Sequence, residues 1–415
     1  MTATSDDIRT IDACDPQLYD DPWETYAWLR SNAPVYKDTT NDIWVISRHQ
    51  DVFDISRNPD LYCSGQGVRP KLDVPLSLIS EDDPEHTRQR RMINRGFTPR
   101  RVRELIPHIQ QLSKELVDDI AAKGEIDFVE ELAIHVPLIV ISEMLGLDPQ
   151  TRLQMYAWSD AMMAGDGHTE ADDPVLHEAA MAFVEYSTMC AGLIAERREN
   201  PKDDLISILT SKFDEGELGN EDEFKAVPGV PEPMGDDELN MFLTVLVVAG
   251  NETTRNALTG GMLALSMFPD ERQRLVENLE DDKFVDLAVD ELIRWTTPVI
   301  SFSRTVTKDH ELHGQSLKEG DRVLLLYQSA NRDEAVFERA DEIILDRDPN
   351  PHLAFGIGPH FCLGANLARL EVKLVFQELF RRLPDIRVPD GGSRQRGENT
   401  LVISLQHLPT VFTPV

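Results

Sequence analysis

The chain has 415 residues, with 74 Asp and Glu against 41 Lys and Arg, and a formal net charge of −33. Its hydrophobic fraction of 41% is that of an ordinary globular protein. An acid excess of this size argues against binding nucleic acid or anionic lipid, because both need a positive surface. The polar start, MTATSDDIRT, predicts neither a signal peptide nor an anchor, and the apolar run around 241–250 is too short to span a bilayer.

The first 80 residues predict a short helix at 22–30, a hairpin of 34–36 with 43–47, and a long Gly/Pro-bearing loop at 64–80. Helical periodicity then fills most of 84–296, with segments at 101–123, 132–146, 174–200, 203–211, 236–266 and 269–279. An acidic stretch rich in Pro and Gly at 213–235 predicts an exposed connection. Strands are expected at 300–306, 322–327 and 401–406, and a helix at 365–382. The sequence therefore predicts a mainly α protein, without a βαβ dinucleotide fold.

The four cysteines are scattered without a CxxC pair, which indicates free thiols in a reducing cytoplasm, and Cys362 stands apart. It lies in FGIGPHFCLG (355–364), just before the helix at 365–382. A helix start lowers the pKa of a thiol, and Gly356, Gly358 and Gly364 allow positive φ. A structural cysteine beside a glycine-rich cap stays possible. A nucleophile would need a base, which His360 at i−2 does not provide. A lone thiolate favours haem iron over zinc, which takes three or four protein ligands.

The pattern Phe-Gly-x-Gly-x-His-x-Cys-x-Gly resembles the haem-binding loop of the cytochrome P450 family, with every position filled. Three further segments in the expected order extend the resemblance from about residue 15 to the C-terminus, closest to soluble bacterial members. It implies the P450 fold, mainly α, as a single domain over 1–415. The β-containing part would cover about 15–80 and 297–415, and the helical part about 84–296. It also implies heme b (iron protoporphyrin IX), with Cys362 as the metal ligand and Phe355 among the cofactor-binding residues.

The helix at 236–266 has one apolar face and then meets AGNETT at 249–254. On the residues alone, a packing groove of small residues with solvated polar neighbours stays open. The stretch is similar to the family's oxygen-activation motif. By that resemblance Thr253 holds the hydrogen bond of the proton relay to dioxygen, and Glu252 feeds protons inward. Ala249 and Gly250 would leave space for dioxygen over the haem.

Two further sets of charged residues match the family's pattern. Glu291 and Arg294 stand at i, i+3, a common surface pair by itself; the resemblance implies a structural triad with Arg347. Buried haem propionates need cationic partners. The resemblance implies His86, Arg90, Arg304 and His360 for this role, with His352 a structural histidine of the cysteine loop.

Residues 88–103 carry seven arginines and no acid, although the whole chain is acidic. The segment is either a solvated helix face or a dock for an acidic partner. In the resembled family it approaches the cysteine side of the haem, which implies a small acidic ferredoxin as electron donor, with Arg369 and Lys373 extending the patch. Nucleic acid is the weaker alternative, because no aromatic residues are interleaved. The candidate patch residues, besides Arg90, are Arg88, Arg91, Arg95, Arg100, Arg101 and Arg103.

The resemblance implies a cytoplasmic, monomeric monooxygenase that takes two electrons, two protons and dioxygen and inserts one oxygen atom into a C–H bond. Leu246, Val299 and Ile300, with parts of the 64–80 loop, are candidate pocket residues and suit a hydrophobic substrate. The segments AGNETTRNALTGGMLAL and DELIRWTTPV look closest to members that hydroxylate sterol side chains or branched lipids. Hydroxylation of a terpenoid or aromatic xenobiotic, peroxide-driven chemistry, and a non-catalytic haem sensor or storage protein are the alternatives.

Overall fold

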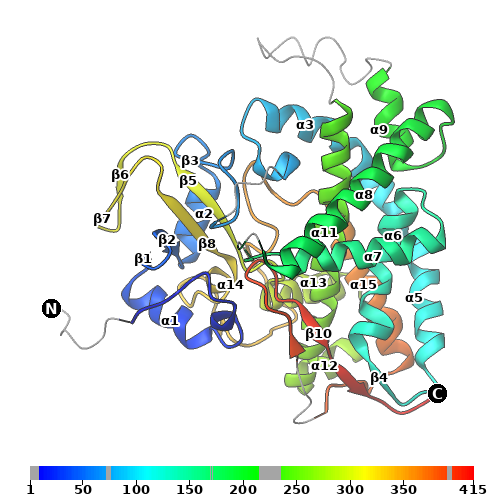
Figure 1. The fold of residues 1–415 in the computed structure, drawn as a ribbon. Helices are drawn as coiled ribbons and strands as arrows, with labels where there is room; N and C mark the ends of the chain where they lie inside the picture. Colours follow the sequence, from blue (N-terminus) through cyan, green and yellow to red (C-terminus); the bar gives the residue numbers. More distant parts are fainter. Residues whose placement is uncertain (1–8, 72–75, 169, 171, 215–234, 390–394) are drawn as a thin grey trace.

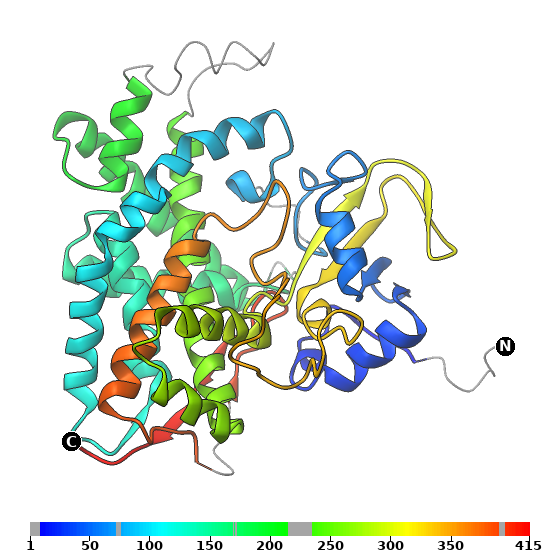
Figure 2. The same ribbon diagram turned by 180° about the vertical axis from the view of Figure 1, so that it is seen from behind.

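The structure, a computed structural model, describes residues 9–71, 76–168, 170, 172–214, 235–389 and 395–415. The side chains of Met92, Arg95 and residues 211–214 are also outside the described part. Figures 1 and 2 show a large helical region beside a smaller region built around a sheet. The mainly α architecture with a smaller β-rich region, predicted from the sequence, is therefore confirmed.

The helical region is arranged around one long central helix, α11 (Figure 1). The helices preceding it are α1 (Trp23–Asn32), α2 (His49–Ser56), α3 (Glu85–Asn94), α4 (Pro99–Glu104), α5 (Ile106–Ile120), α6 (His135–Met144), α7 (Pro149–Ala164), α8 (Pro174–Glu199) and α9 (Leu205–Asp214). They are followed by α11 (Asp236–Met267), α12 (Pro269–Glu277), α13 (Asp282–Thr296), α14 (Tyr327–Ala330) and α15 (Ala365–Arg382). Helix α11 packs against α6, α7, α8, α13 and α15, so nearly its whole circumference is buried.

The larger sheet has five strands in the order β1-β2-β8-β5-β3. The predicted hairpin is confirmed, since β1 and β2 pair antiparallel, and β8 then pairs parallel with β2 and antiparallel with β5. The large-sheet strands are β1 (Val35–Asp38), β2 (Ile43–Ile46), β3 (Tyr62–Cys63), β5 (Ser301–Val306) and β8 (Arg322–Leu326). Two-stranded pairs are formed by β4 (Glu125–Asp127) with β11 (Pro409–Val411), β6 (His310–Leu312) with β7 (Gln315–Leu317), and β9 (Gln395–Arg396) with β10 (Leu405–His407).

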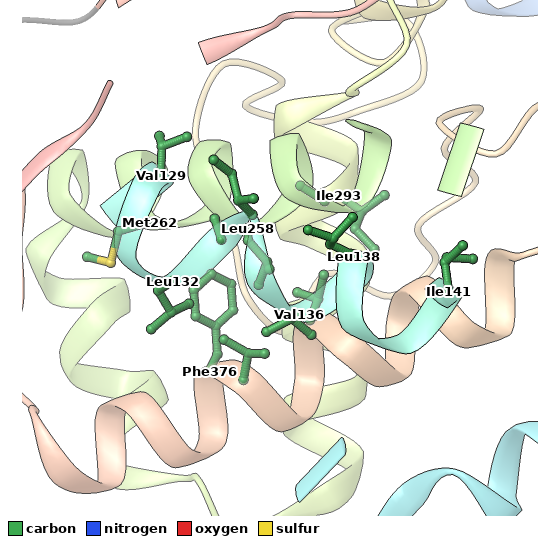
Figure 3. Close-up of a cluster of buried hydrophobic side chains, with 14 of the residues drawn as sticks. Val129, Leu132, Val136, Leu138, Ile141, Leu258, Met262, Ile293 and Phe376 are labelled. Atoms are coloured by element: carbon green, nitrogen blue, oxygen red, sulfur yellow. The ribbon is translucent and has the colours of Figure 1, made fainter. Parts of the chain in front are cut away.

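The largest apolar core lies where α6, α11, α13 and α15 meet (Figure 3). Leu258 and Met262 of α11 are fully buried there, beside Phe376 of α15. The side chains of α6 and the preceding turn complete the contact, namely Val129, Leu132, Val136, Leu138 and Ile141. This core fixes α11 against α15, the helix that follows the cysteine loop.

Three local predictions differ from the structure. The helix expected at 101–123 is two helices, α4 and α5, because Pro107 at the start of α5 lacks an N–H group for a continuous helix. Strand β4 interrupts the helical part at 84–296, and the strand predicted at 401–406 begins only at Leu405. Most of the connection expected at 213–235, and part of the loop at 64–80, lie outside the described residues.

No single helix in the described ranges is both long enough and apolar enough to cross a membrane. One pair of helical segments, Val129–Met144 with Pro149–Ala164, passes the length and composition test together, although it is bent by 117°.

Candidate active site

Cys362 is held in a tight loop at the start of α15. Its N–H donates to the carbonyl of Phe355 at 2.9 Å. Gly356 and Gly358 have φ of 67° and 80°, and a Cβ at Gly358 would lie 2.6 Å from the carbonyl oxygen of Ser56. These two glycines are thus required by the turn and by close packing. Gly364 is different: it caps α15 with φ −85°, so the expectation of positive φ there is wrong.

The thiol of Cys362 has a raised pKa in the chain alone. Burial raises it, and the N–H groups of Gly364 and Ala365, together with Arg90 and Arg369, only partly offset this. The N–H groups at the helix start therefore lower the pKa of the Cys362 thiol, as predicted. The prediction that this pKa is lowered overall is wrong, because the desolvation of the thiol raises it by more. The raised pKa of the free thiol does not prevent it from binding a metal ion, since a coordinating thiol is deprotonated.

His86, Arg90, Arg304 and His360 gather beside the cysteine loop. The rings of His86 and His360 lie 4.2 Å apart, and Nη2 of Arg90 donates to the carbonyl of Phe361 at 2.5 Å. Burial lowers the pKa of His360 to about 2, reinforced by Arg304, His86 and Arg90. The buried Nε2 of His86 and Nδ1 of His360 have no hydrogen-bond partner in the described residues.

Such a cluster fits a group that carries carboxylates. Buried cations and imidazoles that face one another are stabilised by an anion among them. The two propionates of a bound haem would supply this charge, and Cys362 would supply a thiolate ligand for its iron. The donor set is therefore suited to haem.

One face of α11 is accessible to solvent near the middle of the helix. Ala249 is exposed in the middle of an otherwise buried helix, and Thr253 is partly exposed. Thr253 Oγ1 donates to the carbonyl of Ala249 at 2.7 Å, which places its hydroxyl on the same face. Gly250 does not belong to this face, because a Cβ there would lie 2.9 Å from Ile141 Cδ1 of α6. Gly250 was expected to make room over the haem. Instead, its missing side chain allows α11 to lie close to α6.

Glu252 is buried on another side of α11, toward α7. Its Oε2 lies 2.5 Å from Nη2 of Arg255, which is itself completely buried. Burial raises the pKa of Glu252 to about 7; Arg255 lowers it and Asp160 of α7 raises it further. A carboxyl group with this pKa can give and take protons at neutral pH. The sequence reasoning overlooked Arg255, although its spacing of i+3 from Glu252 was a visible signal.

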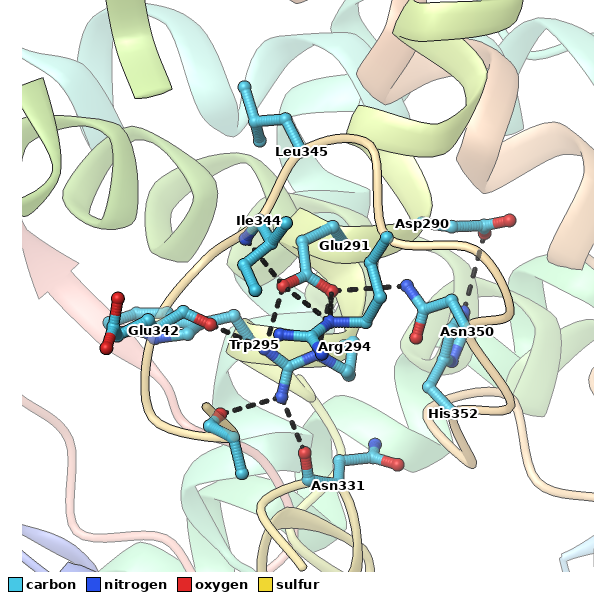
Figure 4. Close-up of polar contacts among 12 residues, drawn as sticks. Asp290, Glu291, Arg294, Trp295, Asn331, Glu342, Ile344, Leu345, Asn350 and His352 are labelled. Atoms are coloured by element: carbon cyan, nitrogen blue, oxygen red, sulfur yellow. Dashed lines mark hydrogen bonds and ion pairs between the residues drawn. The ribbon is translucent and has the colours of Figure 1, made fainter. Parts of the chain in front are cut away.

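Glu291, Arg294 and Arg347 form one buried network that anchors the segment before the cysteine loop (Figure 4). Arg294 Nε donates to Glu291 Oε2 at 2.8 Å, and Arg347 Nε lies 3.1 and 3.0 Å from the two carboxylate oxygens. The backbone N–H of Ile344 and the amide of Asn350 also donate to Glu291. His352 faces Asp290 outside this network, as a structural histidine would.

The arginine-rich segment is only partly free on the surface. Arg91, Arg100, Arg101 and Arg103 are exposed, and Arg100 pairs with Glu104. The expectation that Arg88 belongs to the exposed patch is wrong, because its side chain is only 9% exposed and binds Glu238 of α11 at 2.5 Å. The side chain of Arg95 lies outside the described part.

The expected extension of the arginine-rich patch onto α15 is also corrected. Arg369 pairs with Asp290, and Lys373 pairs with Asp282 and Asp286. These acids neutralise both cations, so the basic patch does not continue along α15.

The candidate pocket residues separate in the structure. Val299 is partly buried beside Val402. Leu246 is enclosed in the helical core, 8% exposed. Ile300 is fully buried against Tyr26 and Leu324 beneath the sheet, so its assignment to the pocket is wrong. Val299 and Ile300, just before β5, therefore pack into different apolar clusters although they are consecutive.

Comparisons with known proteins agree with this site. A family model described as Cytochrome P450 matches residues 174–412. A steroid C26-monooxygenase of Mycolicibacterium smegmatis is 36% identical over 94% of this chain and 92% of its own length. Another steroid C26-monooxygenase, of Mycobacterium tuberculosis, is 38% identical over 94% of this chain and 93% of its own length.

Solved structures give the same result. CYP109E1 from Bacillus megaterium in complex with testosterone is 30% identical, with a TM-score of 0.84 over 95% of this chain and 99% of that one. Mycobacterium marinum CYP268A2 in complex with pseudoionone is 31% identical, with a TM-score of 0.84 over 98% of this chain and 100% of that one. The chain therefore belongs to the cytochrome P450 family. It is a haem-dependent monooxygenase, and not the non-catalytic haem protein that the sequence left open.

Proposed function

We propose that this monooxygenase hydroxylates the side chain of a steroid or a similar branched lipid. The observation that carries the proposal is the similarity, over 94% of the chain, to relatives named steroid C26-monooxygenase. The uncovered face of α11 agrees with it, because Ala249 offers an apolar surface beside Thr253. A terpenoid is the second candidate, since CYP268A2 was solved with pseudoionone.

The residues of the site would divide the work as follows. Cys362 would hold the haem iron through its thiolate, and the bound haem would supply the oxygen-activating chemistry for insertion into a C–H bond. His86, Arg90, Arg304 and His360 would bind the propionates and fix the haem plane. Thr253 would hold a proton at its hydroxyl on the open face of α11. Glu252 would resupply that proton from the side facing α7.

A labelled-oxygen experiment tests the substrate class. Cholesterol, testosterone and pseudoionone are each incubated with the enzyme, a plant-type ferredoxin, its reductase and ¹⁸O₂. We expect one labelled oxygen atom in the side chain of cholesterol, and no such product from testosterone, which lacks that side chain. Turnover of pseudoionone alone would replace the steroid proposal by the terpenoid candidate.

The role of Thr253 is tested by uncoupling. Thr253→Ala should pass electrons to peroxide instead of product, because the proton relay loses its hydroxyl. Thr244→Ala is the matched control, since Thr244 makes the same bond to a carbonyl of α11, at 3.0 Å, but is buried. Unchanged coupling in Thr253→Ala would refute the relay role.

The electron donor that we propose is a small acidic ferredoxin. Arg90 contacts the carbonyl of Phe361, so α3 lies beside the cysteine loop (Figure 2). Arg91, Arg101 and Arg103 are exposed on this segment and its continuation. The double variant Arg101→Gln/Arg103→Gln should raise the KM for ferredoxin, and more so at low salt, because the attraction is electrostatic. An unchanged KM and salt dependence would exclude this surface as the ferredoxin-binding site.

A monomer, a single domain and a cytoplasmic location stay predictions.

A further inference from the structure

Three side chains with metal-binding atoms converge on the surface where β4 meets β10 (Figure 1). Asp127 ends β4, Glu130 lies in the short π-helical turn Val129–Ala133 that follows, and His407 ends β10. Nδ1 of His407 lies 2.9 Å from Oδ2 of Asp127 and 3.5 Å from Oε1 of Glu130. Among the described residues, this is the one group in which three such ligand atoms all lie within 4.8 Å of one another.

Backbone contacts hold two of these residues in place. Oδ1 of Asp127 accepts the N–H groups of Val129 at 2.9 Å and of Leu408 at 3.2 Å, which leaves its Oδ2 to face His407. The N–H of Phe128 donates to the carbonyl of Leu408 at 3.0 Å, so the two segments are also joined through their main chains. Asp127 and His407 are therefore brought together by the fold as well as by their own hydrogen bond.

The negative charge of the two carboxylates is not balanced by a neighbouring cation. One proton on Nδ1 of His407 serves one carboxylate, and the distance of 3.5 Å to Glu130 is longer than a hydrogen bond. In the part of the chain that the structure describes, neither Asp127 nor Glu130 has a Lys or Arg partner. By contrast, Asp118 of α5 pairs with Arg382 of α15. A divalent cation among the three side chains would remove this imbalance.

The spacing and the kinds of atom select the class of ion. Metal–ligand bonds of about 2.0–2.2 Å place neighbouring ligand atoms roughly 3 to 3.5 Å apart around an ion. The distances of 2.9 and 3.5 Å from His407 agree with this spacing. An imidazole nitrogen with two carboxylate oxygens suits a transition metal such as zinc, whereas Mg²⁺ and Ca²⁺ prefer oxygen ligands alone.

We infer that Asp127, Glu130 and His407 form a surface site for a divalent transition-metal ion, which Zn²⁺ represents. Such an ion would join β4 to β10, although its ligands Asp127 and His407 are 280 residues apart in the sequence. Strand β10 is itself attached to the central helix, because the N–H of Leu405 donates to Oδ1 of Asn256 in α11 at 3.1 Å. Bound Zn²⁺ would therefore stabilise the folded chain by mass action, independently of the proposed substrate.

Calorimetric titration of the haem-loaded protein with Zn²⁺ tests the site. We expect a single bound ion per chain, and an affinity lower by about tenfold or more in His407→Ala and in Glu130→Gln, because each variant loses a ligand atom. The side chain of Glu130 contacts only His407 in the described residues, so Glu130→Gln should fold like the wild type.

His168→Ala is the matched control. His168 also bonds an aspartate, Asp173, at 2.6 Å, but no third ligand atom joins this pair in the described residues. We therefore expect His168→Ala to bind Zn²⁺ as the wild type does.

Hydrogen exchange locates the bound ion. Zn²⁺ should slow exchange at 125–131 and 405–411 in the wild type and in His168→Ala, because the ion ties these two segments together. The same concentration of Zn²⁺ should have little effect on these segments in Glu130→Gln. Protection of other segments alone would place the ion elsewhere and contradict the inference.

Three results of the titration would overturn the inference. The first is a wild type that does not bind Zn²⁺. The second is equal affinity in the wild type and Glu130→Gln, which would exclude Glu130 as a ligand. The third is tighter binding of Ca²⁺ than of Zn²⁺, which would exclude the imidazole of His407. The proposed function would stand in each case, because it does not depend on this surface.

Discussion

Replacing Glu291 by Gln tests the network that holds the segment before the cysteine loop. The carboxylate is completely buried and accepts hydrogen bonds from Arg294, Arg347, Asn350 and the backbone of Ile344 (Figure 4). Gln has the same shape but only one acceptor oxygen and no charge. Its NH₂ group would face guanidinium donors, so two buried cations lose their shared counter-charge.

The cost follows from this geometry. Breaking a buried pair by removing one partner costs about 3–5 kcal/mol. Arg294 keeps the carbonyls of Asn331, Ala340 and Glu342, at 2.7, 2.9 and 2.8 Å, which limits the loss. Arg347 keeps the carbonyl of Glu338. We therefore expect a loss of about 4 kcal/mol in the free energy of unfolding, a large share of the 5–15 kcal/mol typical of a folded protein.

Urea unfolding followed by circular dichroism measures this loss, and the ratio of haem to protein reports the cysteine loop. Glu342→Gln is the matched control, because Glu342 pairs with Arg339 on the surface; it should unfold like the wild type. Glu291→Asp keeps the charge and should lose less than Glu291→Gln. If Glu291→Gln is as stable as Glu342→Gln and retains haem, the network does not hold the loop.

Three further variants test other parts of the structure. Burial raises the pKa of Glu371 to about 8, so the folded protein keeps a proton that the unfolded chain releases. Glu371→Gln should therefore match the wild type in unfolding free energy below pH 4.5 and exceed it increasingly up to about pH 8, by about 3 kcal/mol at pH 7; an equal difference at pH 5 and pH 8 would contradict this. Asp166→Asn removes a buried bidentate partner of Arg69, bonded at 2.9 and 3.0 Å, and should cost about 3 kcal/mol and speed hydrogen exchange at 64–71; unchanged exchange would show that the pair does not hold this loop. Arg304→Gln should lower the haem content of purified protein because a propionate loses its cation, and full haem content would exclude that role.

Local patterns predicted the parts of the site that depend on neighbours in sequence. The glycines and Cys362 of one loop, the hydroxyl and acid of α11, and the pair Glu291–Arg294 are all contained within short segments. The four residues expected to bind the haem propionates were also predicted from the sequence. Their proximity in space, however, depends on the fold. His86 and His360 are far apart in sequence and lie 4.2 Å apart in the structure.

The errors come from tertiary contacts that a local pattern does not contain. Arg88 was expected on the surface, but it binds Glu238, 150 residues away. Gly250 was expected to serve the ligand, and its missing side chain accommodates Ile141 instead. The pKa of Cys362 is set mainly by burial, which the helix start alone does not reveal.

The central claim, that Cys362 is the thiolate ligand of a catalytic haem, is tested most directly by the carbon monoxide difference spectrum of the reduced protein. The wild type should show the strongly red-shifted absorption band of thiolate-ligated haem, and Cys362→His should lose it while retaining haem through the cluster of His86, Arg90, Arg304 and His360. A wild-type spectrum without the red-shifted band, or an unchanged band in Cys362→His, would contradict the assignment.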